Sequence, residues 1–432
     1  MEKAEILEIL EEWNFWKREQ ETGINRAEYA KELQRLSETE QVVAIMGIRR
    51  SGKSTIMRQY IKYLIEKGVK PNNILYVNFE DLRFREFDLN LLDQIYEIYL
   101  ERLKPGPMPF IFLDEVQKIK DWERFARTMH ELRKARIFVS GSNAKLLSGN
   151  LASVLTGRHL DIEVFPLDFK EFLFFNSVEA KNELDALAQK YKIKSLFEQY
   201  LEYGGFPLVA LKESKKEILQ TYFEDIINKD VVENYKIENV LKVKALAKFY
   251  LTNIGRRVSF NNLAKTFGLS LDSVERYSYY LQEAYLAFFI KKFSYSVKEQ
   301  EKTRAVVYCI DNGLRNLMSF KFSIDSGWLY QNIVANALIK EFGKENIFYW
   351  MNDTKEECDF VVKEKMKVRQ LIQVCYSLEN TETKEREMKS LLKASKELKC
   401  NNLIVINENK ESEEKFEGKK IKFVPLWKWL LS

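Results

Sequence analysis

Residues 47–54 read GIRRSGKS and fit the spacing GxxxxGK[ST]. The segment follows a short apolar run at 41–47, which we expect to be a strand, and precedes an amphipathic stretch at 54–68, which we expect to be a helix. In this setting glycines let backbone N–H groups close around phosphates, and the start of the helix adds positive potential. Lys53 would reach the β- and γ-phosphates of a nucleotide, and Ser54 would ligate Mg²⁺. The spacing therefore predicts a site for ATP and Mg²⁺.

The predicted nucleotide site includes most of this loop and the first turn of the helix after it. Its members are Gly47, Arg49, Arg50, Ser51, Gly52, Lys53, Ser54 and Thr55. The two arginines inside the loop either touch the nucleotide or a neighbouring subunit, or they point into solvent. An ordinary strand-to-helix connection is the alternative for the whole loop, but it does not require glycine, lysine and serine together at these positions.

An acidic pair, Asp114-Glu115, ends the apolar run FIFLDEV at 110–116. Downstream of a phosphate-binding loop, such a pair is typical of the second half of an ATPase site. Asp114 would hold the Mg²⁺ shell, and Glu115 would polarise the attacking water. An Asp-Glu pair without such a loop is often only a solvated strand end.

Three further residues are candidates for sensing or stabilising the γ-phosphate. Ser142 and Asn143 follow the expected strand at 136–142, where a polar side chain commonly faces the nucleotide; Ser142 is the first choice, and a simple turn is the alternative. Arg158 precedes the last expected strand at 160–165. It either reaches the γ-phosphate of a neighbouring subunit or pairs with an acidic surface. The predicted catalytic residues are Lys53, Glu115, Ser142, Asn143 and Arg158.

Five short apolar runs must position these residues, and helices are expected between most of them. They lie at 41–47, 73–81, 110–116, 136–142 and 160–165, with helices expected at 54–68, 89–103 and 122–135. This alternation predicts a three-layer α/β domain with a parallel sheet. The expected division of the chain is 1–37 (two N-terminal helices), 38–166 (this α/β core), 167–250 (helical), 251–302 (a compact basic module) and 303–432 (mixed α/β).

The basic module contains two expected helices, the first ending at Gly268 and the second capped by Ser270 or Asp272, and then an apolar strand. Helix, tight turn, helix and strand is the winged-helix form of the helix-turn-helix. Segment 252–304 has nine Lys or Arg and five Asp or Glu, a net +4. Such cations favour phosphate contacts with DNA. The candidates are Arg256, Arg257, Arg276, Lys291 and Lys292. Protein docking or a purely structural module is the alternative.

The segment CDFVV…LIQVCYS resembles the metal-binding strands of PD-(D/E)XK nucleases, in which an Asp is followed by Glu-x-Lys on the next strand. Asp359 is present, but Gln373 and Cys375 occupy the Glu and Lys places. Gln331 and Asn332 lie where an upstream helix often supplies a Glu. Mg²⁺ prefers hard anionic oxygens, so we expect a nuclease-like domain without nuclease activity unless Glu356 or Glu357 compensates. Unrelated α/β packing is the alternative.

A resemblance covers nearly the whole chain. The ordered motifs WNFW, GINRAEYAKEL, GIRRSGKST, FLDEVQ, GSNAKLLSG, LTGR, FPLDFKEFL, YGGFP and YCIDNGLRN resemble a group of archaeal and bacterial AAA-type ATPases that carry a C-terminal domain of unknown function. The resemblance implies a P-loop AAA fold, ATP binding and hydrolysis. By analogy it also implies a homo-oligomer, such as a hexameric ring, and work on DNA forks or recombination intermediates. The overall expectation is an α/β chain whose AAA domain precedes a winged helix and a restriction-endonuclease-like domain.

Composition narrows the function classes. The chain carries 69 Lys or Arg and 64 Asp or Glu, a net +5 that permits nucleic-acid binding without requiring it. Two histidines make a histidine metal centre improbable, and four cysteines without CxxC spacing fit a reducing cytoplasm. No signal peptide or membrane helix is expected. Two other function classes compete with a DNA motor: a slow ATP-dependent signalling switch acting on proteins, and a DNA-binding regulator controlled by ATP.

Overall fold

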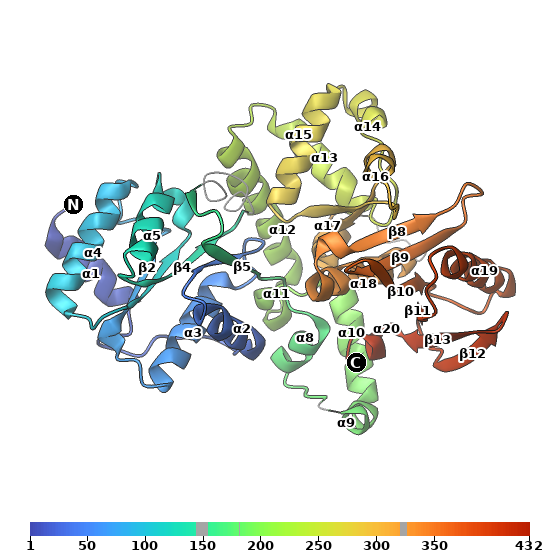
Figure 1. Cartoon of the computed structure of the whole chain (residues 1–432), viewed down its shortest axis with the longest axis horizontal. Helices are drawn as coiled ribbons and strands as arrows, with labels where there is room; N and C mark the ends of the chain where they lie inside the picture. Colours follow the sequence, from blue (N-terminus) through green and yellow to red (C-terminus); the bar gives the residue numbers. More distant parts are fainter. Residues whose placement is uncertain (144–153, 181, 320–325) are drawn as a thin grey trace. The chain divides into compact units, whose positions relative to one another are not determined.

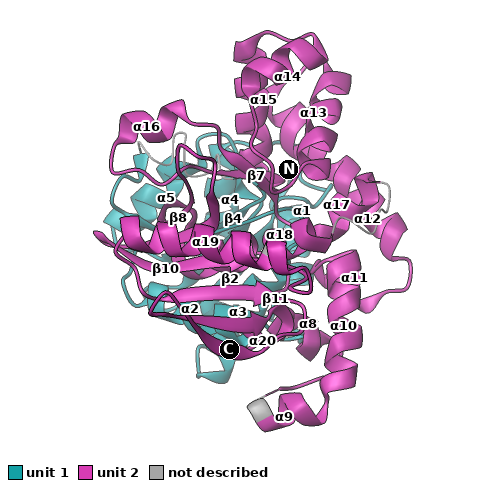
Figure 2. Cartoon of the chain, turned by 90° about the vertical axis from the view of Figure 1, so that its right-hand side faces the viewer, with its two compact units in different colours: residues 1–164 teal, residues 165–432 magenta. Residues whose placement is uncertain are grey.

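The computed structural model describes residues 1–143, 154–180, 182–319 and 326–432. The chain separates into two compact units, Met1–Val164 and Phe165–Ser432, which are coloured separately in Figure 2. Across the described residues, no helix combines the length and the apolar character needed to cross a membrane.

The first unit is built on a five-stranded parallel sheet with the strand order β2-β3-β4-β1-β5, shown in Figure 1. The strands are β1 (Val42–Met46), β2 (Ile74–Asn78), β3 (Phe110–Asp114), β4 (Arg136–Gly141) and β5 (His159–Glu163). This confirms the expectation of an α/β domain with a parallel sheet. The run expected as a strand through Val116 ends at Asp114, because Glu115 adopts a left-handed backbone with φ of 53°.

Helices cover both faces of this sheet. They are α1 (Lys3–Trp13), α2 (Ala27–Ser37), α3 (Lys53–Glu66), α4 (Leu89–Leu103) and α5 (Trp122–Glu131), with short 3₁₀ turns at Pro71–Asn73 and Val116–Lys118. The chain moves one way across the sheet from β1 to β2 and the other way from β2 to β4, so right-handed crossovers place α3 on the face opposite α4 and α5 (Figure 1). The helix expected over 122–135 stops at Glu131, and Arg133 turns left-handed with φ of 49°.

One core cluster joins α2 and α3 to the sheet. Tyr60 on α3 packs against Phe138 on β4 with ring centroids 5.4 Å apart, and Phe138 stacks on Phe112 of β3 at 4.6 Å. Val43 and Ile45 of β1 complete the same cluster. Because helix α3 begins directly after the phosphate loop, this packing fixes the direction in which the loop leaves the sheet.

The second unit begins with helices and continues into the basic module. The helices before the module are α8 (Phe169–Phe175), α9 (Glu183–Ala188), α10 (Lys190–Tyr203), α11 (Pro207–Leu211), α12 (Lys215–Asp225), a π-helix (Ile226–Glu233) and α13 (Val240–Thr252). The module itself has α14 (Phe260–Phe267), α15 (Leu271–Glu283), β6 (Ala287–Ile290), α16 (Val297–Lys302) and β7 (Val306–Cys309), with β6 and β7 antiparallel. Ser270 caps α15 by accepting the N–H of Ser273 at 3.1 Å, as one of the two sequence alternatives predicted.

The remainder of the second unit is a mixed six-stranded sheet with the order β12-β13-β11-β10-β9-β8. Its strands are β8 (Ile347–Met351), β9 (Glu357–Glu364), β10 (Lys367–Val374), β11 (Leu403–Asn407), β12 (Ser412–Phe416) and β13 (Lys419–Pro425). The helices of this part are α17 (Asn312–Met318), α18 (Ser326–Phe342), α19 (Thr381–Glu397) and α20 (Leu426–Trp429), with a 3₁₀ turn at Lys344–Asn346. Strand β12 was not anticipated from the sequence.

Candidate functional site

The phosphate loop runs from the end of β1 to the start of α3, where the sequence predicted it. Gly47 has φ of 142°, and a Cβ at this position would lie 2.1 Å from the carbonyl oxygen of Val164. No larger residue fits this passage without moving the backbone. Gly52 caps α3, so Lys53 is the first residue of the helix. Ser54 and Thr55, both half-buried, follow in the first turn.

Two polar side chains of the loop, those of Ser51 and Lys53, are buried. Lys53 is 4% exposed, and its Nζ donates to the carbonyl oxygens of Gly47 at 3.0 Å and Ile48 at 3.1 Å. The hydroxyl of Ser51 is buried and has no hydrogen-bond partner among the described residues. A buried hydroxyl without a partner is costly unless another group satisfies it, so the loop fits a polar ligand such as a phosphate chain.

The two arginines of the loop behave differently. Arg49 pairs with Glu80, which follows β2, at 3.0 Å, while Arg50 is exposed with φ of 69°. A third arginine, Arg26, was missed by sequence reasoning: it is buried, precedes α2 and donates to the carbonyl oxygen of Ser51 at 2.9 Å. The N-terminal segment therefore holds the outer side of the loop.

Asp114 lies at the carboxyl end of β3, fully buried, and both of its carboxylate oxygens accept hydrogen bonds. The hydroxyl of Tyr76 donates to Oδ2 at 2.6 Å, and the hydroxyl of Ser140 donates to Oδ1. Ser140 also accepts the N–H of Glu115 at 3.0 Å. Because Tyr76 and Ser140 come from the neighbouring β2 and β4, only the strand order reveals them. The two hydroxyl partners fix the orientation of the carboxylate.

Glu115 is held in a strained conformation next to this carboxylate. Its left-handed φ of 53° is uncommon for a residue other than glycine, and such strain clusters at functional sites. The side chain is 7% exposed and accepts from Nε2 of Gln117 at 2.5 Å. Burial raises the pKa of Glu115, and the nearby charge of Lys53 opposes that rise. A carboxylate poised in this way is suited to accept a proton.

The three predicted γ-phosphate residues lie at two edges of the sheet. Ser142 and Asn143 are buried just after β4, and β4 pairs in parallel with β1 so that Gly141 is beside Met46. They therefore share the carboxyl edge with the phosphate loop, while residues 144–153 of the same motif lie outside the described ranges. Arg158 lies at the amino edge, before His159, which pairs with Val42. Its guanidinium is 3.2 Å from Glu131, the arrangement given above as the alternative to an arginine finger.

The predicted DNA-contacting cations do not form one cluster. Arg276 pairs with Asp272 on α15 at 3.3 Å, and Lys291 pairs with Glu301 at 2.5 Å. Lys292 is half-buried, and its backbone forms an isolated parallel β-bridge with Tyr349 of β8. Arg256 and Arg257 differ from these three, because they line a large cavity of the second unit.

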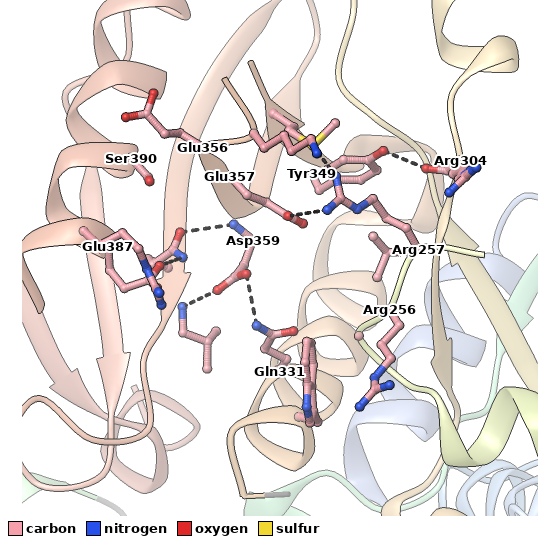
Figure 3. A pocket seen from close by; sticks show the side chains of 18 of the residues that line it. Arg256, Arg257, Arg304, Gln331, Tyr349, Glu356, Glu357, Asp359, Glu387 and Ser390 are labelled. Atoms are coloured by element: carbon pink, nitrogen blue, oxygen red, sulfur yellow. Dashed lines mark hydrogen bonds and ion pairs between the residues drawn. The ribbon is translucent and has the colours of Figure 1, made fainter. Parts of the chain in front are cut away.

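Gln331, Asp359 and Gln373, three of the residues that the nuclease pattern singled out, line this cavity, and Figure 3 shows the first two among its lining side chains. Asp359 accepts from Nε2 of Gln331 at 3.0 Å and from the N–H of Val374 at 2.7 Å. Burial raises the pKa of Asp359 well above its ordinary range, and burial also raises the pKa of Cys375 to about 11. Gln373 donates to Glu387 at 2.5 Å. The position of the nuclease lysine is thus occupied by a neutral thiol.

No group of three or more His, Cys, Asp or Glu side chains positioned to hold a metal ion occurs among the described residues. At the carboxyl edge of the first sheet, the acidic pair Asp114-Glu115 supplies two carboxylates. A metal bound there would also need oxygen ligands from a nucleotide.

A parallel sheet with a glycine loop between its β1 strand and α3 defines the class of P-loop ATPases of the AAA type. The match to known families agrees: residues 39–173 match the family described as AAA domain, and residues 194–325 and 326–429 match two families described as domains of unknown function, DUF8612 and DUF4143. A relative, the uncharacterized protein MJ1544 of Methanocaldococcus jannaschii, is 34% identical over 408 residues, covering 91% of this chain and 88% of the relative. The chain belongs to this family of AAA-domain proteins.

Two further similarities extend the comparison. An uncharacterized protein of Haemophilus influenzae is 29% identical over 367 residues, covering 83% of this chain and 88% of that protein. Among solved structures, the Walker-type ATPase PABY2304 of Pyrococcus abyssi matches with a TM-score of 0.44 and 13% identity, covering 71% of this chain and 99% of that one.

Proposed function

We propose that the chain binds and hydrolyses ATP with Mg²⁺ at the carboxyl edge of the first sheet. The observation that carries this proposal is the placement of Lys53, Asp114 and Glu115 at that one edge, where Ser140 joins the last two. The lysine and the acidic pair come from two separate stretches of sequence and meet where a phosphate chain would follow the loop.

Each residue has a distinct role in the proposed reaction. Lys53 leaves the loop carbonyls and binds the β- and γ-phosphates, and Ser54 offers its hydroxyl to the metal. Asp114, oriented by Tyr76 and Ser140, holds the metal's water shell. Bound Mg²⁺ supplies charge neutralisation of the phosphates.

Glu115 performs the proton transfer of this scheme. Its carboxylate positions the attacking water and accepts the proton that the water loses. The bond from Gln117 keeps the side chain in place before the nucleotide arrives. Ser142 or Asn143 contacts the γ-phosphate from the end of β4, and Arg158 serves a neighbouring subunit if the chain forms a ring.

We further propose that ATP turnover is coupled to DNA through the basic module, and that the module is a winged helix. Support comes from its order of elements, α14, α15 and the β6-β7 pair, and from the net +4 of segment 252–304. The C-terminal sheet is proposed to be a nuclease-like scaffold that does not cut, because amides and a thiol surround Asp359.

Steady-state phosphate release measured with single-stranded, duplex, forked and four-way DNA tests the proposal. We expect DNA to stimulate turnover, and we expect the variant R256Q/R257Q/K291Q/K292Q to abolish the stimulation while basal turnover persists. The matched control is K190Q/K192Q/K212Q/K216Q, which removes four exposed charges from α10 and the helices after it.

The alternatives make different predictions in the same assay. Slow turnover that ignores every DNA would indicate a signalling switch acting on proteins. Strong preference for one duplex sequence, with little change in turnover, would indicate a regulator. Equal loss of DNA stimulation in the variant and its control would mean that the basic module does not couple turnover to DNA.

A further inference from the structure

The second unit contains a cavity of about 1120 Å³ between the basic module and the C-terminal sheet. Small-molecule pockets usually have volumes of about 300–1,000 Å³, so this cavity has room for a ligand of more than one ring system. Its lining comes from the segment 255–257, from 303–308, and from α18, β8, β9, β10 and α19. Figure 3 shows the side chains that line it.

One wall of the cavity is cationic. Arg256, Arg257 and Arg304 line it, and Arg257 is 3.6 Å from Glu357. Arg256 stands over the ring of Trp328 at 5.8 Å. Within the described parts of the chain, the guanidinium groups of Arg256 and Arg304 have no hydrogen bond or ion pair. Two arginines without a counter-charge, on one cavity wall, are suited to an anion.

The backbone of this wall is fixed in place. Gly255 has φ of 74°, and a Cβ there would lie 2.2 Å from the ring of Trp328. Its N–H donates to the carbonyl oxygen of Val307 on β7 at 2.7 Å. The close approach of Trp328 and the bond to β7 hold the neighbouring Arg256 at the cavity. The arginine wall is therefore a rigid part of the basic module.

The opposite side of the cavity is polar and linked by hydrogen bonds. Gln331 donates to Asp359, the N–H of Asp359 donates to Gln373 at 3.2 Å, and Gln373 donates to Glu387. Amide and carboxyl groups of this kind read the edge of a nucleobase, which offers both donors and acceptors. With glutamine in two places where a nuclease has acids, this side repels a phosphate less than a metal-binding cluster would.

We propose that this cavity binds a nucleotide, with its phosphate at Arg256 and Arg304 and its base toward Gln331, Gln373 and Glu387. The nucleotide is either a free mononucleotide or an unpaired residue of a DNA strand. Binding of an unpaired residue of a DNA strand rests on the proposed action on DNA, because Arg256 belongs to the same basic module. The site is separate from the phosphate loop of the first unit.

Fluorescence anisotropy of the full chain without added ATP or ADP tests the proposal, with a labelled twelve-residue thymidine strand as the probe. We expect R256Q/R304Q to weaken strand binding about tenfold or more. It should also reduce the slope of log affinity against log salt concentration by about 0.7, the contribution of one neutralised phosphate on a single strand. The control K298Q/K302Q removes two exposed charges of α16 outside the cavity and should change affinity less than about threefold.

Competition with thymidine 5′-monophosphate distinguishes the two sources. Displacement of the DNA strand by micromolar to millimolar concentrations of the monophosphate indicates a free-nucleotide site. If the strand binds but the monophosphate does not displace it, the cavity recognises a DNA strand. Equal effects of R256Q/R304Q and its control on both ligands would overturn the proposal. The single variants R256Q and R304Q, each expected to give part of the loss, keep the test decisive if the double variant does not fold.

The same data separate this inference from the proposed function. If DNA stimulates turnover but DNA-strand binding does not depend on Arg256 and Arg304, the proposed cavity site is wrong and the DNA-coupled ATPase still stands. If thymidine monophosphate binding depends on both arginines but turnover does not respond to DNA, the cavity site stands and the proposed coupling to DNA is wrong.

Discussion

Two acidic sites of the molecule, those of Asp114 and Asp359, differ in what surrounds the carboxylate. At the end of β3, Asp114 accepts from two hydroxyls and lies beside Glu115, whose pKa is raised by burial while the charge of Lys53 opposes the rise. On β9, Asp359 accepts from an amide and a backbone N–H. At the first site the cation Lys53 acts on the neighbouring glutamate, which suits phosphate chemistry. At the second site the nearby cations pair with other carboxylates, Arg257 with Glu357 and Arg386 with Glu387.

Neutral groups lie around the second carboxylate. The thiol of Cys375, with its pKa raised to about 11 by burial, stays neutral near physiological pH. Gln331 and Gln373 lie on the polar side of the cavity, which can therefore form neutral hydrogen bonds. The cations Arg256 and Arg304 lie on the other wall of the cavity. An anion can bind there, but no metal-activated water is expected.

Removing the cation of the first site should have the largest effect. We expect K53A to lower ATP turnover about 10²- to 10³-fold, because the lysine donates to phosphate oxygens on which charge develops. Phosphate release measures it. The control is K62A on the same helix α3, an exposed lysine paired with Glu19; a loss as large in the control would contradict the assignment.

The fit of the loop to its surroundings can be broken with one methyl group. G47A should lower the unfolding midpoint of the first unit by about 5–10 °C, because the Cβ would strike the carbonyl oxygen of Val164 and φ is positive. G68A is the matched control, since Gly68 also has a positive φ, 95°, but no described atom lies within 4 Å of the place its Cβ would take. Calorimetry of both variants should show the larger loss for G47A; equal losses would mean that the close contact with Val164 contributes nothing.

The state of Asp359 gives a pH prediction. Its folded pKa lies above the ordinary 3.8, so its contribution to stability is fully present below pH 3.8 and is lost as pH rises through the folded value. D359N, which mimics the protonated acid, should match the wild type at low pH and be more stable than the wild type at pH 8. Denaturant unfolding across this range measures it, with D353N, an exposed position, as the control.

D359N also tests the contrast between the two sites directly. ATP turnover should remain unchanged, and the wild type should show no Mg²⁺-dependent DNA cleavage. Cleavage that disappears in D359N would show that the second site retains metal chemistry.

A smaller effect should come from the arginine that holds the outer side of the phosphate loop. R26Q removes the hydrogen bond to the carbonyl oxygen of Ser51, so the loop is less well ordered before ATP binds. We expect KM for ATP to rise about three- to tenfold with kcat within about twofold, a loss near 1 kcal/mol that is typical of one hydrogen bond. R35Q on α2, where the exposed arginine pairs with Glu32, is the control. A fall in kcat with constant KM would contradict a positioning role.

Sequence reasoning predicted the parallel sheet and its α/β class, and it placed the loop between the strand and helix where the structure has them. Glycine spacing and apolar runs are local signals, and they sufficed. Arg26, Tyr76 and Ser140 were missed because their roles arise from strand order and from contacts between distant segments. Nothing in the residues around them marks them as partners of the loop or of Asp114.

In the basic module, net charge drew attention to five cations. Three of them, Arg257, Arg276 and Lys291, are in ion pairs, which charge counting does not detect. Arg304 was not singled out, although it lines the same cavity as Arg256. Strand β12 was overlooked because its sequence, SEEKF, has three consecutive charged residues and no apolar alternation.

The central claim, that Glu115 accepts the proton from the attacking water, is tested most directly by E115Q. Nucleotide affinity and single-turnover phosphate release would be measured on the same preparation. We expect ATP affinity within about threefold of the wild type and release slower by about 10²- to 10⁴-fold, the range for loss of a general base. Release that stays within about threefold of the wild type, with affinity retained, would contradict the account.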